Sequence, residues 1–370
     1  MNITLESAQL LKCLGHIQTV VERRNTIPIL ANVLIRAEKG VVSFLATDME
    51  IEVKETVTAD VGREGAITAP AHTLYEIVRK LPGGAQVELA SDGAQLSLRT
   101  GRSHFKLGCL PVEDFPAMPE GDHTHNFSIA ASALANLIDK TRFAISTEET
   151  RYYLNGIYLH TAKDEGADVL RAAATDGHRL ARVQAALPEG AQGMAGIIVP
   201  RKTVNEVRKL LDGASGALEV ALSAAKIRFA FDGIVMTSKL IDGTFPDYER
   251  VIPAGNDKIV DVDAKIMAQA VDRVATISSE KSRGIKLCVS AGQMTLAASA
   301  PEAGSASEEI EVNYNGADLD IGFNARYLLD ILAQIESDSV RFSLADAQAP
   351  AIVQDAANAS ALYVLMPMRV

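Results

Sequence analysis

The sequence is poor in cysteine and in aromatic residues. Tryptophan is absent, and Phe, Trp and Tyr together make up 5% of the 370 residues. Cys13, Cys109 and Cys288 lie far apart and form no CxxC pair, which is typical of reduced thiols and unlike a disulfide framework or a cysteine metal site. We expect each cysteine to be a small, buried, apolar side chain in a protein of the cytoplasm.

Long apolar runs are also missing. A long stretch without a charged residue, residues 287–301, is interrupted by Ser, Gln and Gly, so it is too short and too polar to cross a bilayer. The N-terminal residues MNITLE offer neither a basic segment nor an apolar segment of a secretory signal. With 48% hydrophobic and 22% charged residues, the composition is that of a globular protein.

Catalytic motifs are scarce. The sequence contains no P-loop, GxGxxG, GxSxG or HExxH pattern. The segment TDGHRL at residues 175–180 could supply acid–base chemistry through Asp176 and His178. No second histidine accompanies them, so we expect a turn or a surface feature, with no catalytic residue, metal or cofactor. The alternative is a hydrolase or nucleotidyl-transfer enzyme that uses Asp176 and His178.

The dominant positive feature is a threefold internal repeat. Apolar strand sequences at residues 1–5, 127–129 and 259–262 each lead into an amphipathic helix that begins near Ser7, Ala131 or Ala264. A charged loop follows each helix, at residues 22–25, 148–151 and 280–283. Thr47 and Asp48 in the first repeat correspond to Thr175 and Asp176 in the second, which assigns the Thr-Asp pair to the scaffold.

A second landmark gives the length of the repeat. Pro70, Pro200 and Asn324 each precede an apolar helical segment, and 130 and 124 residues separate them. Repeats of this length are large enough to be domains with their own cores. Because Pro and polar residues collect at 116–125 and 246–257, we place three domains at residues 1–122, 126–250 and 251–370.

Strand patterns complete the prediction of fold class. Residues 41–45, 86–89, 95–98 and 226–230 alternate apolar and polar side chains between Gly, Asp and Pro turns, which is typical of antiparallel strands with one face in a core. Each repeat should therefore contain about two helices and several antiparallel strands, and the fold class is α+β.

Positive charge is concentrated on the predicted helices. Segments 7–24, 71–81, 131–143, 201–211, 264–276 and 325–336 carry net charges of +2, +1, +1, +3, +1 and −1. They total +7 in a chain of net charge −11, which leaves −18 elsewhere. Basic residues favour solvated helix faces in general, but three repeats should place these helices on one surface. We therefore expect a surface that faces a polyanion such as the DNA backbone.

Several sequence strings resemble a known family. They are TIPIL at 26–30, RYYLNG at 151–156, ATDGHRLA at 174–181, VPRK at 199–202, TSKL at 237–240, FPDY at 245–248 and YVLMPMRV at 363–370. Together they resemble, in order and along the entire chain, the beta subunits of bacterial DNA polymerase III, the sliding clamps.

The resemblance implies a ring of two three-domain subunits joined head to tail. Helices would line the hole around duplex DNA, strands would lie outside, and the protein would be a non-catalytic, cytoplasmic and nucleoid-associated processivity factor without a cofactor. Implied partners are the replicative polymerase, the clamp loader, repair polymerases and other clamp-motif proteins. The implied DNA-facing residues are Arg24, Tyr152, Tyr153, Arg201 and Lys202. His72-Thr73 and Glu148-Glu149 depart from the basic character that the family has near DNA.

The resemblance also implies a hydrophobic cleft that captures short peptide motifs. Met366 and Met368 would form adaptable walls, and Arg179, Asn324 and Arg369 would orient the peptide. Val370 stands where a terminal Leu is more usual. The implied cleft residues are Leu154, Thr175, Gly177, His178, Arg179, Leu180, Pro246, Arg250, Val251, Asn324, Tyr327, Met366, Pro367, Met368 and Arg369.

Ring closure requires complementary edges on the first and third domains. Basic residues alternate along 102–106, and acidic residues collect at 302–309, so opposite charges could set the register of the contact. Such charges also protect ordinary edge strands against aggregation. The predicted interface residues are Arg102, His104, Phe105, Lys106, Leu107, Ile277, Glu302, Glu308 and Glu309.

Overall fold

The computed structural model describes residues 1–24, 26–119, 121–278 and 283–369. Most of the third charged loop predicted at 280–283, Asn25 of the first loop, and Val370 lie outside the described residues. Two of the three charged loops can therefore be followed in the structure, apart from Asn25.

Six α-helices lie in the described part of the chain, two in each sequence repeat, as predicted. Each begins at the first residue of the predicted segment. Their bounds are α1 Ser7–Ile17, α2 Ala71–Val78, α3 Ala131–Asp139, α4 Arg201–Leu210, α5 Ala264–Ala275 and α6 Ala325–Leu332.

The same backbone contact starts the first helix of every repeat. The N–H groups of Ser7, Ala131 and Ala264 donate to the carbonyl oxygens of Ala85, Gly216 and Asp338 at 2.8, 2.9 and 2.9 Å, respectively. These donors belong to the first turns, where helical N–H groups have no partner within the helix. The repeated contact supports the triplication that the sequence predicts.

The helices end earlier than the sequence predicts. The first stops at Ile17, seven residues before the expected end at Arg24, and the six helices as observed carry a net charge of +3 in place of +7. Several of the basic residues beyond the helix ends are paired with acids, as Arg142 is with Asp139 at 3.0 Å. The positive charge is therefore less concentrated on the helices than predicted.

Four sheets contain the strands, and every pairing among the named strands is antiparallel, as predicted. Sheet A has the order β5 (Asp60–Arg63), β1 (Asn2–Glu6), β7 (Gln86–Ser91), β8 (Gln95–Thr100) and β9 (Ser103–Gly108). Sheet D has the order β21 (Gly304–Glu311), β20 (Gln293–Ala300), β19 (Gly284–Ser290) and β22 (Leu319–Asn324).

The two larger sheets have eight strands each. Sheet B has the order β10 (His125–Ala130), β15 (Ala217–Leu222), β16 (Lys226–Phe231), β17 (Ile234–Lys239), β4 (Ile51–Thr58), β3 (Val41–Thr47), β2 (Asn32–Glu38) and β6 (Gly65–Pro70). Sheet C has the order β14 (Ile197–Pro200), β11 (Gly156–Asp164), β12 (Ala167–Thr175), β13 (Arg179–Ala186), β25 (Ala361–Leu365), β24 (Ala351–Asp355), β23 (Ser339–Leu344) and β18 (Lys258–Asp263).

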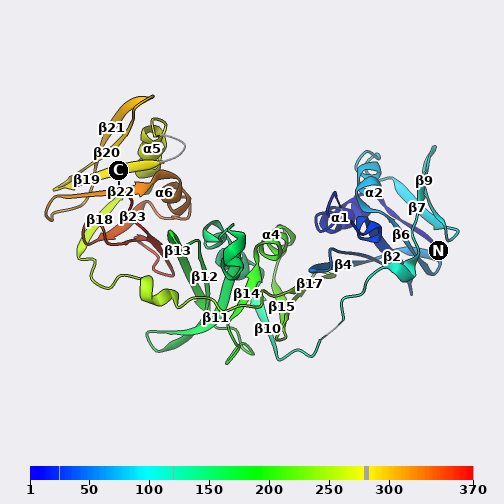
Figure 1. Ribbon diagram of the computed structural model, residues 1–370. Helices are drawn as coiled ribbons and strands as arrows, with labels where there is room; N and C mark the ends of the chain where they lie inside the picture. Colours follow the sequence, from blue (N-terminus) through cyan, green and yellow to red (C-terminus); the bar gives the residue numbers. More distant parts are fainter. Residues whose placement is uncertain (25, 120, 279–282, 370) are drawn as a thin grey trace. The chain divides into compact units, whose positions relative to one another are not determined.

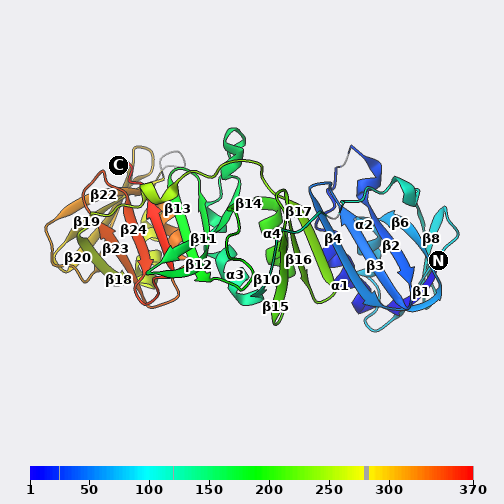
Figure 2. The ribbon, with the colours of Figure 1, turned by 90° about the horizontal axis from the view of Figure 1, so that it is seen from below.

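Both large sheets continue across the boundaries between repeats. In sheet B, β17 of the second repeat pairs with β4 of the first, and Figure 2 shows these strands side by side. In sheet C, β13 of the second repeat pairs with β25 of the third. The second repeat therefore contributes four strands to each of two sheets, one shared with the first repeat and one with the third.

The contacts accordingly group the chain into two compact units. The first contains Met1–Ser132, Pro188–Ala191 and Lys202–Leu240, and the second contains Ala133–Leu187, Gln192–Arg201 and Ile241–Val370. The inter-repeat strand pairing accounts for this grouping, because it divides the second repeat between the two units. The boundaries proposed from the sequence remain a prediction.

Each unit has a helix pair packed on strands. In the first unit α1 packs on α2 and against β3 and β4, and in the second α5 packs on α6 and against β20 and β21 (Figure 1). Cys13 on α1 is buried as predicted, but Cys109 and Cys288 are only half-buried. No helix among the described residues is long and apolar enough to cross a membrane.

Candidate functional site

The segment that contains Asp176 and His178 is a tight turn between β12 and β13. The carboxylate oxygen Asp176 Oδ1 accepts the N–H groups of His178 and Arg179 at 2.9 and 3.0 Å. The Thr175 hydroxyl donates to the Arg179 carbonyl at 2.7 Å and accepts the N–H of Gly177 at 3.1 Å. Gly177 has a φ of +89°, which a side chain would strain. The predicted turn is therefore confirmed.

Arg179 is the centre of a buried network in the second unit. Its guanidinium donates to Asp176 Oδ2 at 3.0 Å, to Asp330 Oδ2 at 2.6 Å and to the Phe143 carbonyl at 2.5 Å. It also lies over the Tyr327 ring, 4.3 Å from the centroid. Nη1 and Nη2 thus hold β13 to α6 and to the residues after α3, while Nε holds the turn itself.

This network bears on one residue of the predicted cleft. Arg179 is 9% exposed and three of its N–H groups are bonded within the chain, so its role in orienting a peptide stays a prediction that must be compatible with these bonds. Asp330 and Phe143 were not predicted. No local pattern marks them, because Asp330 is 151 residues away from Arg179 in the sequence.

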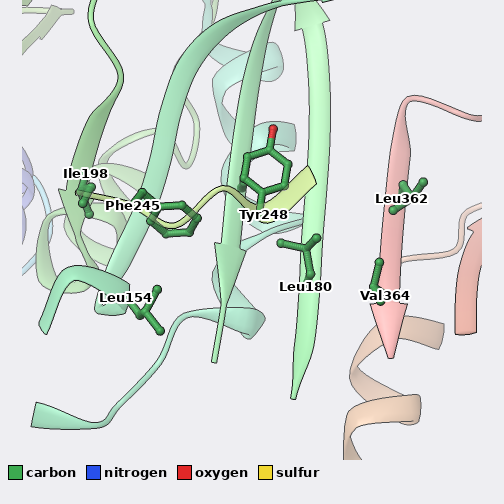
Figure 3. Packing of buried hydrophobic residues seen from close by; sticks show 8 residues of the cluster. Leu154, Leu180, Ile198, Phe245, Tyr248, Leu362 and Val364 are labelled. Carbon is green, nitrogen blue, oxygen red and sulfur yellow. The ribbon is translucent and has the colours of Figure 1, made fainter. Parts of the chain in front are cut away.

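A cluster of buried apolar residues lies beside this turn (Figure 3). Leu154 and Leu180, both predicted cleft residues, are 4% and 2% exposed and belong to it. Ile252 and Tyr153 are partly buried against the same cluster. The remaining members come from β12, β14, β25 and the segment before β18, and they are Ala173, Ile198, Phe245, Tyr248, Leu362 and Val364.

The C-terminal segment runs from this cluster onto the third repeat. The N–H of Met366 donates to the His178 carbonyl at 3.0 Å, and the N–H of Met368 donates to the Gly322 carbonyl at 2.8 Å. The His178 ring stacks on Tyr327, with ring centroids 6.3 Å apart. A main-chain bond and a ring contact therefore bring His178, Tyr327 and Met366 together at one edge of the cluster.

Apolar side chains beside the cluster are exposed. Val251 in the short helix Tyr248–Val251 is 51% exposed, and Met366 is 42% exposed. Pro246 and Arg250 are also exposed, and Arg250 pairs with Asp247 at 2.7 Å. A closed core would cover such side chains, so this surface is suited to bind an apolar partner.

The other predicted cleft residues have distinct positions. Asn324 caps α6, since its Oδ1 accepts the N–H groups of Arg326 and Tyr327 at 3.0 and 3.3 Å; only its side-chain NH2 group is left to bind a ligand. Pro367, Met368 and Arg369 line a cavity of about 540 Å³ with residues of β19 and β22. That cavity does not include the turn at His178.

The predicted DNA-facing residues differ in their availability. Arg24 and Arg201 are exposed and form no side-chain ion pair within the described ranges. Tyr152 is 53% exposed, and its ring meets that of Tyr153 edge-on at 5.8 Å. These four side chains are accessible wholly or in part.

Lys202, by contrast, is not a free cation. Its Nζ donates to Glu22 at 2.8 Å and also to Asp48. Partial burial acts to lower the pKa of Lys202, but the hydrogen bonds and charges of Asp48 and Glu22 outweigh burial and raise that pKa. The prediction of a DNA-facing lysine therefore has to include competition with two carboxylates.

The two departures from the family pattern also have structural partners. His72 on α2 contacts the Gln18 side chain through Nδ1 at 3.0 Å and the Val21 carbonyl through Nε2 at 2.9 Å. It therefore fixes the chain after α1. Glu148 pairs with Arg151 at 2.8 Å, so part of the acidic character of this loop is neutralised locally.

The predicted interface residues lie on or next to edge strands, except Ile277, which follows α5. β9 is at one edge of sheet A and β21 at one edge of sheet D. Phe105 and Leu107 pair with buried Leu98 and Leu96, so the alternating basic side chains of this segment lie on the other face of β9. Those basic side chains, Arg102, His104 and Lys106, are all exposed.

One of the acidic residues of the predicted interface is bonded within the chain. Glu308 binds Arg273 of α5 through two hydrogen bonds of 2.5 and 3.0 Å. Glu302 and Glu309 are exposed, and Ile277 is half-buried. Glu308 is therefore a weaker candidate for a contact with another subunit than the sequence suggests.

Acid–base chemistry finds no support at Asp176 and His178. Both Asp176 oxygens accept hydrogen bonds from the turn and from Arg179, and His178 stacks on Tyr327. No group of three or more potential metal ligands occurs within the described ranges. The arrangement stabilises a turn and an exposed apolar surface.

Three repeats of two helices on antiparallel strands, with sheets that continue between repeats, define the class of DNA clamps. Family models agree: residues 1–119, 128–247 and 249–369 match the N-terminal, central and C-terminal domains of the DNA polymerase III beta subunit. The chain belongs to the DNA polymerase III beta subunit family. It is a sliding clamp, an accessory processivity factor of DNA replication that acts with DNA and a polymerase.

Relatives match along the whole chain. The beta sliding clamp of Caulobacter vibrioides is 53% identical over 372 residues, and that of Escherichia coli is 38% identical over 370 residues, each with 100% of both chains covered. A DnaN sliding clamp of Bartonella birtlesii bound to griselimycin has a TM-score of 0.98 at 51% identity, with 100% of both chains covered. The enzyme alternative finds no counterpart among these relatives.

Proposed function

We propose that two copies of this chain close head to tail into a ring around duplex DNA and tether a polymerase through a peptide-binding cleft. The observation that carries the proposal is the pair of edge strands β9 and β21, which carry opposite charges and lie in different sheets. An edge strand offers unpaired backbone groups to another chain. A heterologous contact of this kind closes when the angle between subunits is right.

Charge reversal tests the ring. Arg102→Glu combined with Lys106→Glu would put like charges opposite Glu302 and Glu309 of the partner, at both interfaces of the dimer. Because like-charge contacts cost several kcal/mol, we expect the dimer dissociation constant to rise by about two orders of magnitude. Analytical ultracentrifugation measures the change.

Two further variants complete this experiment. Lys39→Glu combined with Lys163→Glu makes the same charge change on exposed lysines that lie outside the edge strands β9 and β21. This control variant should leave the dimer intact. Adding Glu302→Arg and Glu309→Arg to the reversed variant should restore dimerisation. An unchanged dimer in the first variant, or no recovery in the last, would contradict this interface.

Enclosure of DNA explains how an acidic protein can hold a polyanion. Inside a ring, Arg24, Arg201, Tyr152 and Tyr153 would need to supply only weak attraction to phosphates, independent of base sequence. Lys202 would join them when DNA phosphates displace Glu22 or Asp48. Protein loaded on circular duplex DNA should survive a wash in salt that removes groove binders and should be lost when the circle is cut; equal loss from both forms would exclude enclosure.

The peptide-binding cleft is proposed at the surface around Val251, His178 and Met366. The buried cluster below gives it a firm floor, while Met366 and Met368 can repack around different Leu or Phe anchors. Clients would be the replicative polymerase, the clamp loader, repair polymerases and other proteins with clamp motifs. Leu154 and Leu180 would form the floor, and Arg179 would position the His178 turn.

A non-catalytic role follows from this proposal. The three domains would be residues 1–122, 126–250 and 251–370, and the protein would work in the cytoplasm at the nucleoid. Purified protein alone should show neither nuclease nor polymerase turnover. Turnover that is lost in His178→Ala would favour the hydrolase or nucleotidyl-transfer alternative instead.

A further inference from the structure

The first unit contains a pocket on the face of sheet B opposite its core. Strands β2, β3, β4, β16 and β17 and the segment around residues 112–119 line a cavity of about 470 Å³. Lining residues such as Leu45 and Val235 alternate with the fully buried Phe44 and Met236. Since successive side chains of a strand point to opposite faces, the pocket lies on the face away from the buried side chains.

The pocket concentrates positive charge. Arg36, Lys54 and Arg228 line it, and none of these three forms an ion pair within the described ranges. Lys54 is directly opposite Leu45 on one side and Val235 on the other, so its charge lies among aliphatic side chains. Lys226 and Glu52 also line the cavity, so four cations face one carboxylate among the described lining residues. In a chain of net charge −11, this excess of positive charge around one cavity favours an anionic ligand.

Hydrogen bonds hold the segment around residues 112–119 to two strands of sheet B beside the pocket. The Lys226 ammonium donates to the Pro119 carbonyl at 2.6 Å, and the Met118 N–H donates to Glu52 at 3.3 Å. Half-buried Phe115 lies in the same segment and lines the cavity. These contacts preform one wall, which lowers the entropic cost of binding.

We propose that this pocket binds an acidic peptide segment of a partner protein, with an aliphatic side chain between its carboxylates. The carboxylates would pair with Arg36, Lys54 and Arg228, and the aliphatic side chain would contact Leu45 and Val235. A cavity of about 470 Å³ admits a few side chains and excludes a DNA duplex. Phe115 is half-buried in the wall, so only part of it is accessible to a stacked base.

The site is separate from the proposed peptide cleft, since its residues belong to the first unit and those of the cleft to the second. The probe is a synthetic peptide with one isoleucine flanked by four glutamates. The matched control peptide keeps the isoleucine and has glutamine at each of the four glutamate positions. Binding is measured by isothermal titration calorimetry at low salt. We expect the glutamate peptide to bind, the glutamine peptide to bind at least about tenfold more weakly, and added salt to weaken binding.

Variants locate the binding. Lys54→Glu and Arg228→Glu should each weaken the glutamate peptide by about tenfold, as expected when attraction becomes repulsion. Lys39→Glu, an equal charge change at the turn between β2 and β3, should leave affinity unchanged, and so should Met368→Ala in the cleft. Melting curves check that all variants are folded.

Three outcomes would overturn the proposal. They are no binding of the glutamate peptide, equal weakening by Lys39→Glu, and a preference for single-stranded oligothymidine that Lys54→Glu and Arg228→Glu abolish. The last outcome would assign the pocket to nucleic acid. None of these results bears on ring closure, which the charge reversals on β9 test independently.

Discussion

The turn before β4 in the first unit and the turn before β13 in the second are two versions of one structure. Asp48 Oδ1 accepts the N–H groups of Glu50 and Ile51 at 2.9 and 2.7 Å, as Asp176 Oδ1 does at the equivalent positions of its own turn. The Thr47 hydroxyl also donates to the Ile51 carbonyl at 2.8 Å. Each turn precedes the strand that joins its repeat to the next.

The two turns differ in how they hold the second helix of the following repeat. In the first unit the turn supplies the acid, Asp48, and α4 supplies the base, Lys202. In the second unit the turn supplies the base, Arg179, and α6 supplies the acid, Asp330. The charges are exchanged while the connection is kept, which shows that the link between repeats, and not the identity of either residue, is the common requirement.

The largest expected difference concerns the stability of these links. Arg179→Ala removes three hydrogen bonds and leaves the largely buried Asp176 without its cation, so the free energy of unfolding should fall by about 3 kcal/mol. Lys202→Ala removes a lysine whose side chain is 37% exposed and should cost about 1 kcal/mol. Urea unfolding measures both, with hydrogen exchange at β13 or β4 to localise the loss. Equal costs would show that exposure does not decide the strength of the link.

A second expected difference is functional, because only the second turn borders the proposed peptide cleft. Met368→Ala and His178→Ala should each weaken a Leu- and Phe-containing clamp-binding peptide by about 1–2 kcal/mol while folding stays nearly intact. Met49, which corresponds to Gly177, is 46% exposed, and Met49→Ala is the matched control with no expected effect.

Calorimetric titration beside a melting curve makes this measurement. If Met368 were a core residue, Met368→Ala would instead lower stability by about 2–5 kcal/mol. Unchanged peptide affinity in well-folded Met368→Ala and His178→Ala variants would remove the cleft from the proposed function.

The left-handed position of each turn gives a third difference, of opposite sign in the two units. Gly177→Ala would place a side chain at φ +89°, with its Cβ 2.8 Å from Arg151 Nη1, and should cost about 1 kcal/mol. Met49 already bears a side chain at φ +75°, so Met49→Gly should be neutral or stabilise by up to about 0.5 kcal/mol. Thermal unfolding compares the pair, and a loss of stability in Met49→Gly would contradict the strain argument.

Salt should produce the smallest difference. The exposed Lys202 pair is open to screening, so the cost of Lys202→Ala should fall by about half or more in 1 M NaCl. The Arg179 network is buried, so the cost of Arg179→Ala should change little. Repeating the urea titrations at two salt concentrations tests this. An equal response of both variants to salt would show that the two networks are equally open to screening by solvent ions.

The sequence predicted the local features of this molecule well. The predicted helix starts were correct. Some are capped locally, as when Asp263 accepts the Ile266 N–H at 2.8 Å to cap α5, while the first helix of each repeat also has a backbone contact with a carbonyl that is distant in the sequence. The repeated Thr-Asp turn was also correct, since its hydrogen bonds span at most four residues. Features that depend on distant partners could not be predicted, and the pairing of Arg179 with Asp330 is the clearest case.

The same distinction explains what the sequence did not reveal around individual residues. Lys202 stays a predicted DNA contact, but its partner Asp48 lies 154 residues away and no local pattern marks it. α1 ends at Ile17 although apolar periodicity continues to Val21, because the chain turns there and His72 of α2 fixes the Val21 carbonyl at 2.9 Å. Tertiary contacts decided both outcomes.

The strand pairs β17–β4 and β13–β25 have a consequence for how the molecule evolved and how it unfolds. Gene duplication copies a repeat, but a second repeat expressed alone would have two unpaired edge strands, β17 and β13. Such edges invite aggregation. The repeated stretch of sequence is therefore shorter than the sheets it builds, and both of these edges of the middle copy are completed by the copy next to it.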